Sequence, residues 1–327
     1  MRATMRAAVC VRAGGPDVLE IREVPLPVVR KGWSLIRVMA AGLNRSELRT
    51  RQGHSPGVRF PRVLGIECVG VVAGSTDPAL PEGTTVAAVM GEMGRAFDGG
   101  YAEYTLLPDA LLMPVRTTLP WPTLAALPET YLTAQGAVDA LRIGPGARLV
   151  IRGGTSSVGM AAASIARAHG VEVAATTRRP EKAAGLRSAG VGHVVLDDGG
   201  PLRLPWPERP SHVLDLVGAD TVVDSLRLAG RGGTVCVAGS LSGWLIRDFE
   251  PIAMIPSGAR LTAFHSDDAK GSAGAAVLQR VVGEVEAGVH QPHVDRVFAL
   301  DDVVAAHEYM EGNRAAGKVV LQPRLAA

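Results

Sequence analysis

The 327-residue sequence predicts an α/β fold in which a doubly wound parallel sheet is inserted into a β-rich domain. Up to about residue 120 the chain is rich in glycine and proline, and short alternating runs such as SLIRVMAAG and GTTVAAVM are separated by turn residues. From about residue 123, long Ala/Leu-rich stretches alternate with short apolar runs. Alternation of helices and strands is typical of a parallel doubly wound sheet.

The expected strands of the parallel sheet are the apolar runs RLVIRGG, VEVAATTR, HVVLDD, HVLDLVG, GGTVCVAGS and RLTAFH. After about residue 267 a helix-like stretch, AAVLQRVVGEVEAG, leads into a tail that ends in helix and strand. This tail is too short to fold alone, so we expect it to return to the first domain. The predicted domains are residues 1–122, 123–266 and 267–327.

Composition narrows the classes of partner and compartment. Lys+Arg exceed Asp+Glu by 34 − 32 = 2, and the charges are interspersed, so nucleic acid is not an expected partner. The sequence shows neither a signal-peptide pattern nor an apolar run long enough to span a membrane, and a cytoplasmic location without a membrane partner is therefore expected. Cys10, Cys68 and Cys236 are scattered singly in apolar contexts, which predicts buried packing residues in a reducing compartment.

A glycine-rich turn carries the strongest chemical signal. The diphosphate of a dinucleotide needs backbone N–H groups at a helix N-terminus and a tight turn without obstructing side chains. In RGGTSSVG, Gly153, Gly154 and Gly159 supply that room, and Ser156 and Ser157 keep the side chains small. Glycine in such a turn can serve geometry alone. Because this turn follows a strand and opens a helix inside a strand–helix–strand unit, it predicts cofactor binding.

The end of the next predicted strand indicates which dinucleotide is bound. NAD-selective sites place an acid about 20 residues beyond the glycine loop, whereas NADP-selective sites place a cation there. Here the strand ends at Thr177, Arg178 and Arg179, with Lys182 in the following turn. A guanidinium can bind the 2′-phosphate through two hydrogen bonds, so the pattern predicts NADPH. The alternative is that these cations are solvated surface charges.

The ordered motifs resemble the medium-chain dehydrogenase/reductase superfamily, in particular its zinc-independent quinone oxidoreductase branch. The resemblance extends over essentially the whole chain and rests on MRAAVCVRAGGPDVLEIREVPLP, AAGLNRSELRTRQG, PRVLGIECVGVVAG, DGGYAEYTLLP, AALPETYLTAQGAV, RGGTSSVG, LDLVGADTVVDSLRLAGRGGTVCVAGS and GKVVLQP. It implies a GroES-like catalytic domain around an inserted Rossmann domain, with NADPH bound in the cleft between them.

The same resemblance implies that no metal takes part. Alcohol dehydrogenases of the superfamily hold catalytic zinc with a Cys in the segment matching GLNRSE and a His in the segment matching LGIECVG. Asn44 and Ile66 stand at these positions and supply neither a thiolate nor an imidazole. The four-cysteine structural zinc lobe is also missing. Without a metal to polarise the carbonyl group, the resemblance implies hydride transfer to an acceptor that is already activated, such as a quinone or an α,β-unsaturated carbonyl.

By resemblance, Asn44 and Thr133 are expected at the nicotinamide and substrate end of the site. Arg49 stands where the branch often has a tyrosine, so we do not assume that a tyrosine serves as the proton donor here. Arg49 or Arg51 could attract an anionic or electron-rich substrate, or could be solvated or face a phosphate. His290 and His293 have a metal-like spacing, but Pro292 disrupts the helix that such a pair would need, which predicts a surface loop.

The complete set of residues predicted to bind the cofactor combines the glycine loop, the second strand end and positions carried over from the family. It comprises Gly153, Gly154, Thr155, Ser156, Ser157, Val158, Gly159, Thr177, Arg178, Lys182, Val217, Gly239, Ser240, Leu241, Phe264 and Lys318. For Val217, Gly239, Ser240 and Leu241 the alternative is that they only terminate strands. For Lys318 the alternative is an exposed strand lysine.

Three functions compete at this stage. The leading one is an NADPH-dependent quinone or enone reductase acting on a small-molecule acceptor. The second is an enoyl-thioester reductase, which would need a tyrosine donor and an acyl-carrier groove that the sequence does not identify. The third is a protein that binds NADPH in a structural or regulatory role. A homodimer is expected by resemblance, with GGTVCVAGS and RLTAFH apolar enough to pair with a second copy.

Overall fold

The computed structural model describes residues 4–243 and 245–323, and within them the chain forms two compact units. Unit 1 contains residues 4–129, 266–287 and 294–323, and unit 2 contains residues 130–265 and 288–293. Residues 123–129 thus pack with unit 1 and residues 288–293 with unit 2, whereas the sequence-based boundaries placed them the other way round. In the described part of the chain, no helix is long and apolar enough to cross a membrane.

Unit 2 is built on a parallel sheet of six strands among the described residues, in the order β11-β10-β9-β12-β13-β14. The strands are β9 (Arg148–Arg152), β10 (Glu172–Thr177), β11 (His193–Leu196), β12 (His212–Asp215), β13 (Thr234–Val237) and β14 (Arg260–Ala263). The order reverses between β9 and β12, as in a doubly wound nucleotide-binding sheet. The six predicted strands and the α/β fold class are confirmed.

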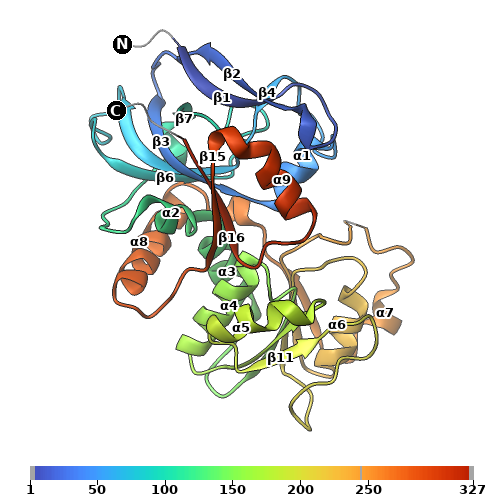
Figure 1. Ribbon diagram of the computed structural model, residues 1–327. Coiled ribbons are helices and arrows are strands. Elements are labelled where there is room, and N and C mark those ends of the chain that lie inside the picture. Colours follow the sequence, from blue (N-terminus) through green and yellow to red (C-terminus); the bar gives the residue numbers. More distant parts are fainter. Residues whose placement is uncertain (1–3, 244, 324–327) are drawn as a thin grey trace. The chain divides into compact units, whose positions relative to one another are not determined.

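The helices of unit 2 follow the strands and cover the sheet (Figure 1). They are α4 (Ser157–Ala168), α5 (Ala183–Ser188), α6 (Val222–Ala229) and α7 (Pro251–Met254), while α3 (Pro128–Leu141) begins in unit 1 and continues into unit 2. Helix α4 packs on β9 and β10, and α6 packs on β12 and β13. Val150, Val213 and Val235 are fully buried in the sheet beside Leu226 of α6. Strands covered on both faces explain why the sequence shows continuous apolar runs rather than alternation.

Unit 1 contains two sheets and four α-helices among the described residues (Figure 1). The smaller sheet has the order β2-β1-β4, and the larger has the order β15-β16-β3-β5-β6-β8 with β7 paired to β3. The strands are β1 (Thr4–Cys10), β2 (Leu19–Pro25), β3 (Trp33–Leu43), β4 (Arg62–Val63), β5 (Glu67–Gly74), β6 (Thr85–Val89), β7 (Tyr104–Pro108), β8 (Met113–Pro114), β15 (Val294–Ala299) and β16 (Lys318–Gln322). The helices are α1 (Arg45–Arg51), α2 (Trp121–Ala125), α8 (Ser272–Glu286) and α9 (Val303–Glu311).

The C-terminal strand joins the sheet of unit 1 next to its longest strand. β16 pairs antiparallel with β3, and the register sets Val319 opposite Leu43 and Leu321 opposite Ala41. Lys318 therefore lies beside Asn44, the residue that follows β3. This register brings together two positions that are separated by 274 residues in the sequence.

The core of unit 1 also buries polar side chains. Cys10 and Cys68 are buried here and Cys236 in unit 2, which confirms the predicted burial of all three. His307 of α9 is fully buried, contacts the Tyr101 ring edge-to-face, and makes no hydrogen bond with either ring nitrogen among the described residues. Burial lowers the pKa of His307 to about 3, and the nearby Arg51 guanidinium acts in the same direction.

His307 should make folding sensitive to acid. In the unfolded chain its imidazole has its ordinary pKa near 6.5, so between pH 6.5 and 3 the unfolded state binds a proton that the folded state excludes. Stability from the buried neutral ring is therefore present above pH 6.5 and is lost as pH falls, by about 1.4 kcal/mol for each pH unit. Urea unfolding at pH 5.5 and 4.5, where the unfolded imidazole is almost fully protonated, should show this loss in the wild type and a smaller one in His307→Leu. Equal losses in the two proteins would remove His307 as the cause.

Candidate functional site

The glycine loop of unit 2 connects β9 to α4 and is held against β10. The Gly153 N–H donates to Thr176 Oγ1 over 3.2 Å, and the Gly154 N–H donates to the Thr176 carbonyl over 3.0 Å. Ser156 caps α4, because its Oγ accepts from the Gly159 N–H at 3.1 Å and donates to the Gly153 carbonyl at 2.8 Å. Loop and helix N-terminus are thereby fixed as one rigid turn.

The glycines of this loop are required by close backbone approaches. Gly153 has φ = 75°, a conformation that side chains with a Cβ rarely adopt. A Cβ on Gly154 would lie 2.7 Å from the Ala175 Cβ, and one on Gly159 would lie 2.7 Å from the Gly154 carbonyl oxygen. Helix α4 can therefore begin directly against the sheet, and its N-terminus carries the partial positive charge that favours a diphosphate. The loop fits the dinucleotide that the sequence predicts.

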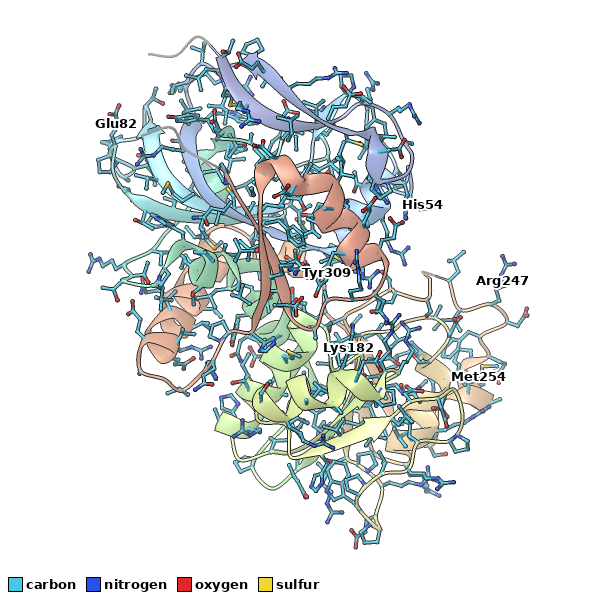
Figure 2. The ribbon with its side chains drawn as sticks, viewed as in Figure 1. His54, Glu82, Lys182, Arg247, Met254 and Tyr309 are labelled. Atoms are coloured by element: carbon cyan, nitrogen blue, oxygen red, sulfur yellow. The ribbon has the colours of Figure 1, made fainter. Side chains whose placement is uncertain are left out.

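The three predicted 2′-phosphate residues differ in what their side chains offer. Arg178 follows β10 and is exposed. Thr177 is buried, and its hydroxyl accepts from the Arg179 N–H at 3.1 Å and donates to the Arg179 carbonyl at 3.0 Å. Lys182 is 8% exposed and lies among the packed side chains of unit 2 (Figure 2). Arg178 is therefore the member of this group that presents its cation at the surface.

The remaining predicted cofactor residues of unit 2 lie at the same edge of the sheet, where the parallel strands end. Val217 follows β12, while Gly239, Ser240 and Leu241 follow β13. The two loops are joined because the Ser242 N–H donates to the Val217 carbonyl at 2.9 Å. Thr155, Ser157 and Val158 belong to the glycine loop and the first turn of α4.

Phe264 follows β14 and packs on α3. A Cβ on Gly136 of α3 would lie 2.1 Å from the tip of the Phe264 ring, so the ring occupies the space that this glycine leaves. The Phe264 N–H also donates to the Val237 carbonyl over 3.1 Å, which continues the pairing of β14 with β13. Thr133 lies on the same helix and is buried. The structure thus gives Phe264 a fixed ring position at the C-terminal edge of the sheet.

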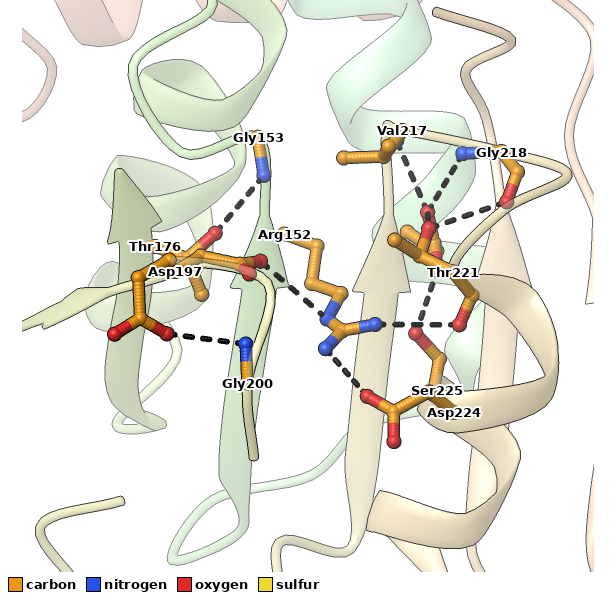
Figure 3. A network of polar contacts seen from close by, with 12 residues as sticks. Arg152, Gly153, Thr176, Asp197, Gly200, Val217, Gly218, Thr221, Asp224 and Ser225 are labelled. Atoms are coloured by element: carbon orange, nitrogen blue, oxygen red, sulfur yellow. Dashed lines mark hydrogen bonds and ion pairs between the residues drawn. The ribbon is translucent and has the colours of Figure 1, made fainter. Parts of the chain in front are cut away.

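A buried arginine beneath the glycine loop was missed by sequence reasoning. Arg152, the last residue of β9, is 3% exposed, and Figure 3 shows its guanidinium reaching the start of α6. It donates to Asp224 Oδ2 at 2.5 Å and to the Thr221 carbonyl at 3.2 Å, and it lies 3.9 Å from an Asp197 oxygen. Asp197 follows β11, and its N–H donates to the Thr177 carbonyl. An acid therefore does lie close to the end of β10, but it faces a buried cation.

Asp215 organises the neighbouring loop between β12 and α6 (Figure 3). This fully buried carboxylate accepts from the N–H groups of Val217 and Gly218 at 3.0 and 2.9 Å. It also accepts from the hydroxyls of Thr221 and Ser225 at 2.9 and 2.6 Å. Four donors fix the loop that carries Val217, which the sequence analysis assigned to the cofactor.

Unit 1 contains a buried polar cluster centred on Lys318. The Lys318 ammonium, 1% exposed, lies 2.5 Å from Glu67 Oε1 and 2.7 Å from Asn44 Oδ1. Asn44 Nδ2 donates to the same Glu67 oxygen at 2.9 Å, which closes a triangle of amide, carboxylate and ammonium. Gly42 allows this approach, since a Cβ there would lie 2.1 Å from Glu67 Oε1. Lys318 was predicted to contact the cofactor, but its ammonium is buried against Glu67 and Asn44 instead.

Two further carboxyl groups join this cluster, and sequence reasoning singled out neither. Glu47 of α1, 1% exposed, accepts from the N–H groups of Asn44 at 3.0 Å and Ile66 at 2.9 Å. Glu129, in the first turn of α3, donates its N–H to Glu67 Oε2 at 2.9 Å. Burial raises the pKa of Glu47 to about 7 and that of Glu129 to about 8, and the charge on Glu67 acts in the same direction.

Two of the arginines considered as substrate contacts occupy different environments. Arg51 is fully buried and pairs with Glu311 at 2.9 Å, so it does not present a cation to a substrate. Arg49 lies half-buried on α1, and its proposed role stays a prediction.

His290 was predicted to lie in a surface loop; it does lie in a loop, but the predicted exposure is wrong. The residue is 4% exposed, its Nδ1 lies 2.9 Å from the Ser164 hydroxyl, and its ring lies 5.7 Å from the Tyr131 ring. Because Pro292 prevents a helix, the segment was expected to be exposed to solvent. It instead turns back and packs on α3 and α4. His293 is half-buried.

The unit 1 cluster does not fit a zinc ion. At the two positions where zinc enzymes of the superfamily have Cys and His, Ile66 has an aliphatic side chain, and Asn44 Oδ1 already accepts from the Lys318 ammonium. A divalent cation bound at Asn44 or Glu67 would meet that ammonium at hydrogen-bond distance, and the repulsion would be large in a buried site. Among the described residues, no group of three or more His, Cys, Asp and Glu is arranged to hold a metal ion.

Comparison with known proteins identifies both domains of the chain. Residues 30–117 match the alcohol dehydrogenase GroES-like domain, and residues 189–321 match the zinc-binding dehydrogenase family. A quinone oxidoreductase of Pongo abelii is 28% identical over 97% of each chain. An NADPH-dependent alkenal/one oxidoreductase of Arabidopsis thaliana is 29% identical, covering 98% of this chain and 80% of that protein.

Solved structures agree with the fold. A putative alcohol dehydrogenase of Sinorhizobium meliloti superposes with a TM-score of 0.85 at 26% identity, covering 99% of this chain and 98% of that one. The quinone oxidoreductase of Coxiella burnetii superposes with a TM-score of 0.87 at 24% identity, over 98% of this chain and all of that one. The domains, the relatives and the fold together show a nicotinamide-dependent oxidoreductase. The chain belongs to the medium-chain dehydrogenase/reductase superfamily, in its quinone oxidoreductase branch.

Proposed function

We propose that this protein is an NADPH-dependent reductase that transfers hydride to a quinone or an α,β-unsaturated carbonyl without a metal ion. The observation that carries the proposal is the Lys318 ammonium, held at 2.5 Å from Glu67 and 2.7 Å from Asn44, the residue that stands where zinc enzymes of the superfamily have a cysteine ligand. A site without a Lewis acid suits acceptors whose carbonyl is already activated by conjugation. The names of the quinone and alkenal/one oxidoreductase relatives point to the same acceptor class.

The end of β10 supports NADPH as the hydride donor. Arg178 is exposed there, whereas Asp197, the acid of the neighbouring strand end, is 15% exposed and faces the Arg152 guanidinium. A ribose 2′-OH would need a free carboxylate, and a 2′-phosphate would need a cation. The charges at this edge therefore favour the phosphorylated cofactor.

The chain's own residues supply position and polarity to the reaction. When bound, the nicotinamide supplies a hydride from its C4. The rigid turn from Gly153 to Gly159 is proposed to hold the diphosphate, and the Phe264 ring to form a wall of the nicotinamide site. Asn44 is fixed by its bonds to Glu67 and Lys318, which prepares its amide to orient the acceptor.

We also infer a cytoplasmic homodimer. β14 ends the six-stranded order of the described sheet, so its outer edge is available to pair with the same strand of a second copy.

An acceptor panel tests the proposed function directly. NADPH oxidation should be followed with 1,4-naphthoquinone, trans-2-hexenal and crotonyl-coenzyme A at one protein concentration. Turnover of the quinone or the enal above that of the thioester is the expected result. Preferred turnover of the thioester would point to an enoyl-thioester reductase. Tight NADPH binding without turnover of any acceptor would favour a structural or regulatory role.

A further inference from the structure

Three carboxyl groups from separate elements of unit 1 meet around a single ammonium among the described residues. Glu47 comes from α1, Glu67 from β5 and Glu129 from the start of α3, and all three interact with Lys318 of β16. The phenol of Tyr101 also faces Glu47 and Glu67, and burial together with these two acids raises its pKa well above the ordinary value. One positive charge cannot compensate three buried negative charges, so the cluster must retain protons.

The hydrogen bonds show which carboxyl group holds the Lys318 ammonium. Glu67 receives the ammonium of Lys318 at 2.5 Å, the amide of Asn44 at 2.9 Å and the N–H of Glu129 at 2.9 Å. Donors surround both of its oxygens, and a proton on it would displace one of them. Glu47 likewise accepts a backbone N–H on each oxygen, so Glu129 is the carboxyl group best placed to retain a proton.

Of these two acids, Glu129 is the one that can exchange its proton. Glu47 is 1% exposed, and both of its oxygens accept backbone N–H groups, from Ile66 and Asn44. Glu129 is partly exposed as a residue, although its Oε2 atom is buried, and its carboxyl group bonds to the Ser266 side chain. A proton lost from Glu129 can thus be replaced from solvent.

We propose that Glu129 is the proton donor of the reduction, an assignment that rests on the proposed function. As hydride forms the new C–H bond at the β-carbon of an enone, the carbon–carbon π electrons move toward the carbonyl oxygen. The O–H bond of the Glu129 carboxyl group then breaks, and its proton is delivered to the α-carbon or the oxygen of the acceptor. The Glu129 carboxylate that remains is stabilised by the Lys318 ammonium and Ser266, and water restores its proton.

The kinetic test compares Glu129→Gln with Glu82→Gln, whose side chain is exposed and points away from unit 1 (Figure 2). Glu129→Gln should lower kcat by on the order of 100-fold with little change in KM for the acceptor, because general acids contribute about 10²- to 10⁴-fold. Wild-type kcat should fall as pH rises through about 8, where Glu129 loses its proton. This limb should be absent in Glu129→Gln and retained in Glu129→Asp and Glu82→Gln. Wild-type kcat with an unchanged alkaline limb in Glu129→Gln would overturn the assignment.

A second readout needs no turnover and covers the case in which Glu129→Gln does not fold. Infrared spectra of the cofactor-free wild type, with and without ¹³C-labelled glutamate, should show a protonated carboxyl band that shifts with the label and titrates near pH 8. In Glu129→Asp, which keeps a carboxyl group, the band that titrates there should no longer shift with the glutamate label. Absence of this band in the wild type at neutral pH would contradict the assignment. Turnover without any effect of Glu129→Gln would remove only the donor role, whereas no turnover of any acceptor would remove the proposed function and the donor role together.

Discussion

Lys318→Met should lower the free energy of unfolding by about 3–5 kcal/mol, the cost of leaving a buried charge without its partner. Lys318 is 1% exposed and Glu67 fully buried, so water cannot take the place of the ammonium that now lies 2.5 Å from Glu67. Methionine keeps most of the length of the side chain and removes the charge. Urea unfolding of the wild type and the variant under the same conditions measures this loss.

A surface pair in the same unit provides the matched control. Lys270 lies 2.5 Å from Asp267, but the two side chains are 39% and 36% exposed. Lys270→Met should cost less than about 1 kcal/mol, because water and salt screen an exposed pair. A similar small loss for Lys318→Met would mean that the buried ammonium does not hold the cluster together.

Arg178→Ala should weaken NADPH binding by about 10- to 150-fold, since hydrogen bonds to charged groups contribute roughly 1.5–3 kcal/mol. Arg178 is exposed at the end of β10, whereas Thr177 uses its hydroxyl within the turn and Lys182 is buried. The 2′-phosphate is therefore expected to depend mainly on this guanidinium, and the affinity for NADH should barely change. Titration of both proteins with both cofactors, at one salt concentration, measures the difference.

Arg179→Ala is the control for position and charge. Arg179 is the next residue and is also exposed, and its guanidinium lies 3.7 Å from Glu181. We expect Arg179→Ala to weaken NADPH binding much less than Arg178→Ala does. If Arg178→Ala weakens the binding of NADPH and NADH equally, or of neither, the arginine is a solvated surface charge. The preference for NADPH would then have another origin.

The parallel sheet could be predicted from the sequence because each of its strands is a local pattern. The run RLVIRGG became β9 and its glycine turn, since a strand covered on both faces needs consecutive apolar residues. The glycine loop could be predicted for the same reason, because its geometry depends on contacts among residues 153–159 and with the adjacent β10.

The polar cluster of unit 1 could not be predicted as a set, because its members are brought together by strand register. Lys318 and Glu67 are 251 residues apart in the sequence and meet through the pairing of β16 and β5 with β3. Each of the two residues is nevertheless recognisable in the sequence as a single charge within an apolar strand: Glu67 in GIECVGVV and Lys318 in GKVVLQ. Arg152 in RLVIRGG has the same signature. Such isolated charges predict buried pairs, although the sequence does not name the partner.

Metal removal tests the central claim most directly. The protein should be dialysed exhaustively against a strong chelator, analysed for zinc, and assayed for NADPH oxidation with 1,4-naphthoquinone and trans-2-hexenal before and after. Because the Lys318 ammonium contacts Asn44 and Glu67, and Ile66 supplies no metal ligand, we expect no stoichiometric zinc at the outset and an unchanged rate after dialysis. About one zinc per chain, with activity that is lost on chelation and restored by added zinc, would contradict the account.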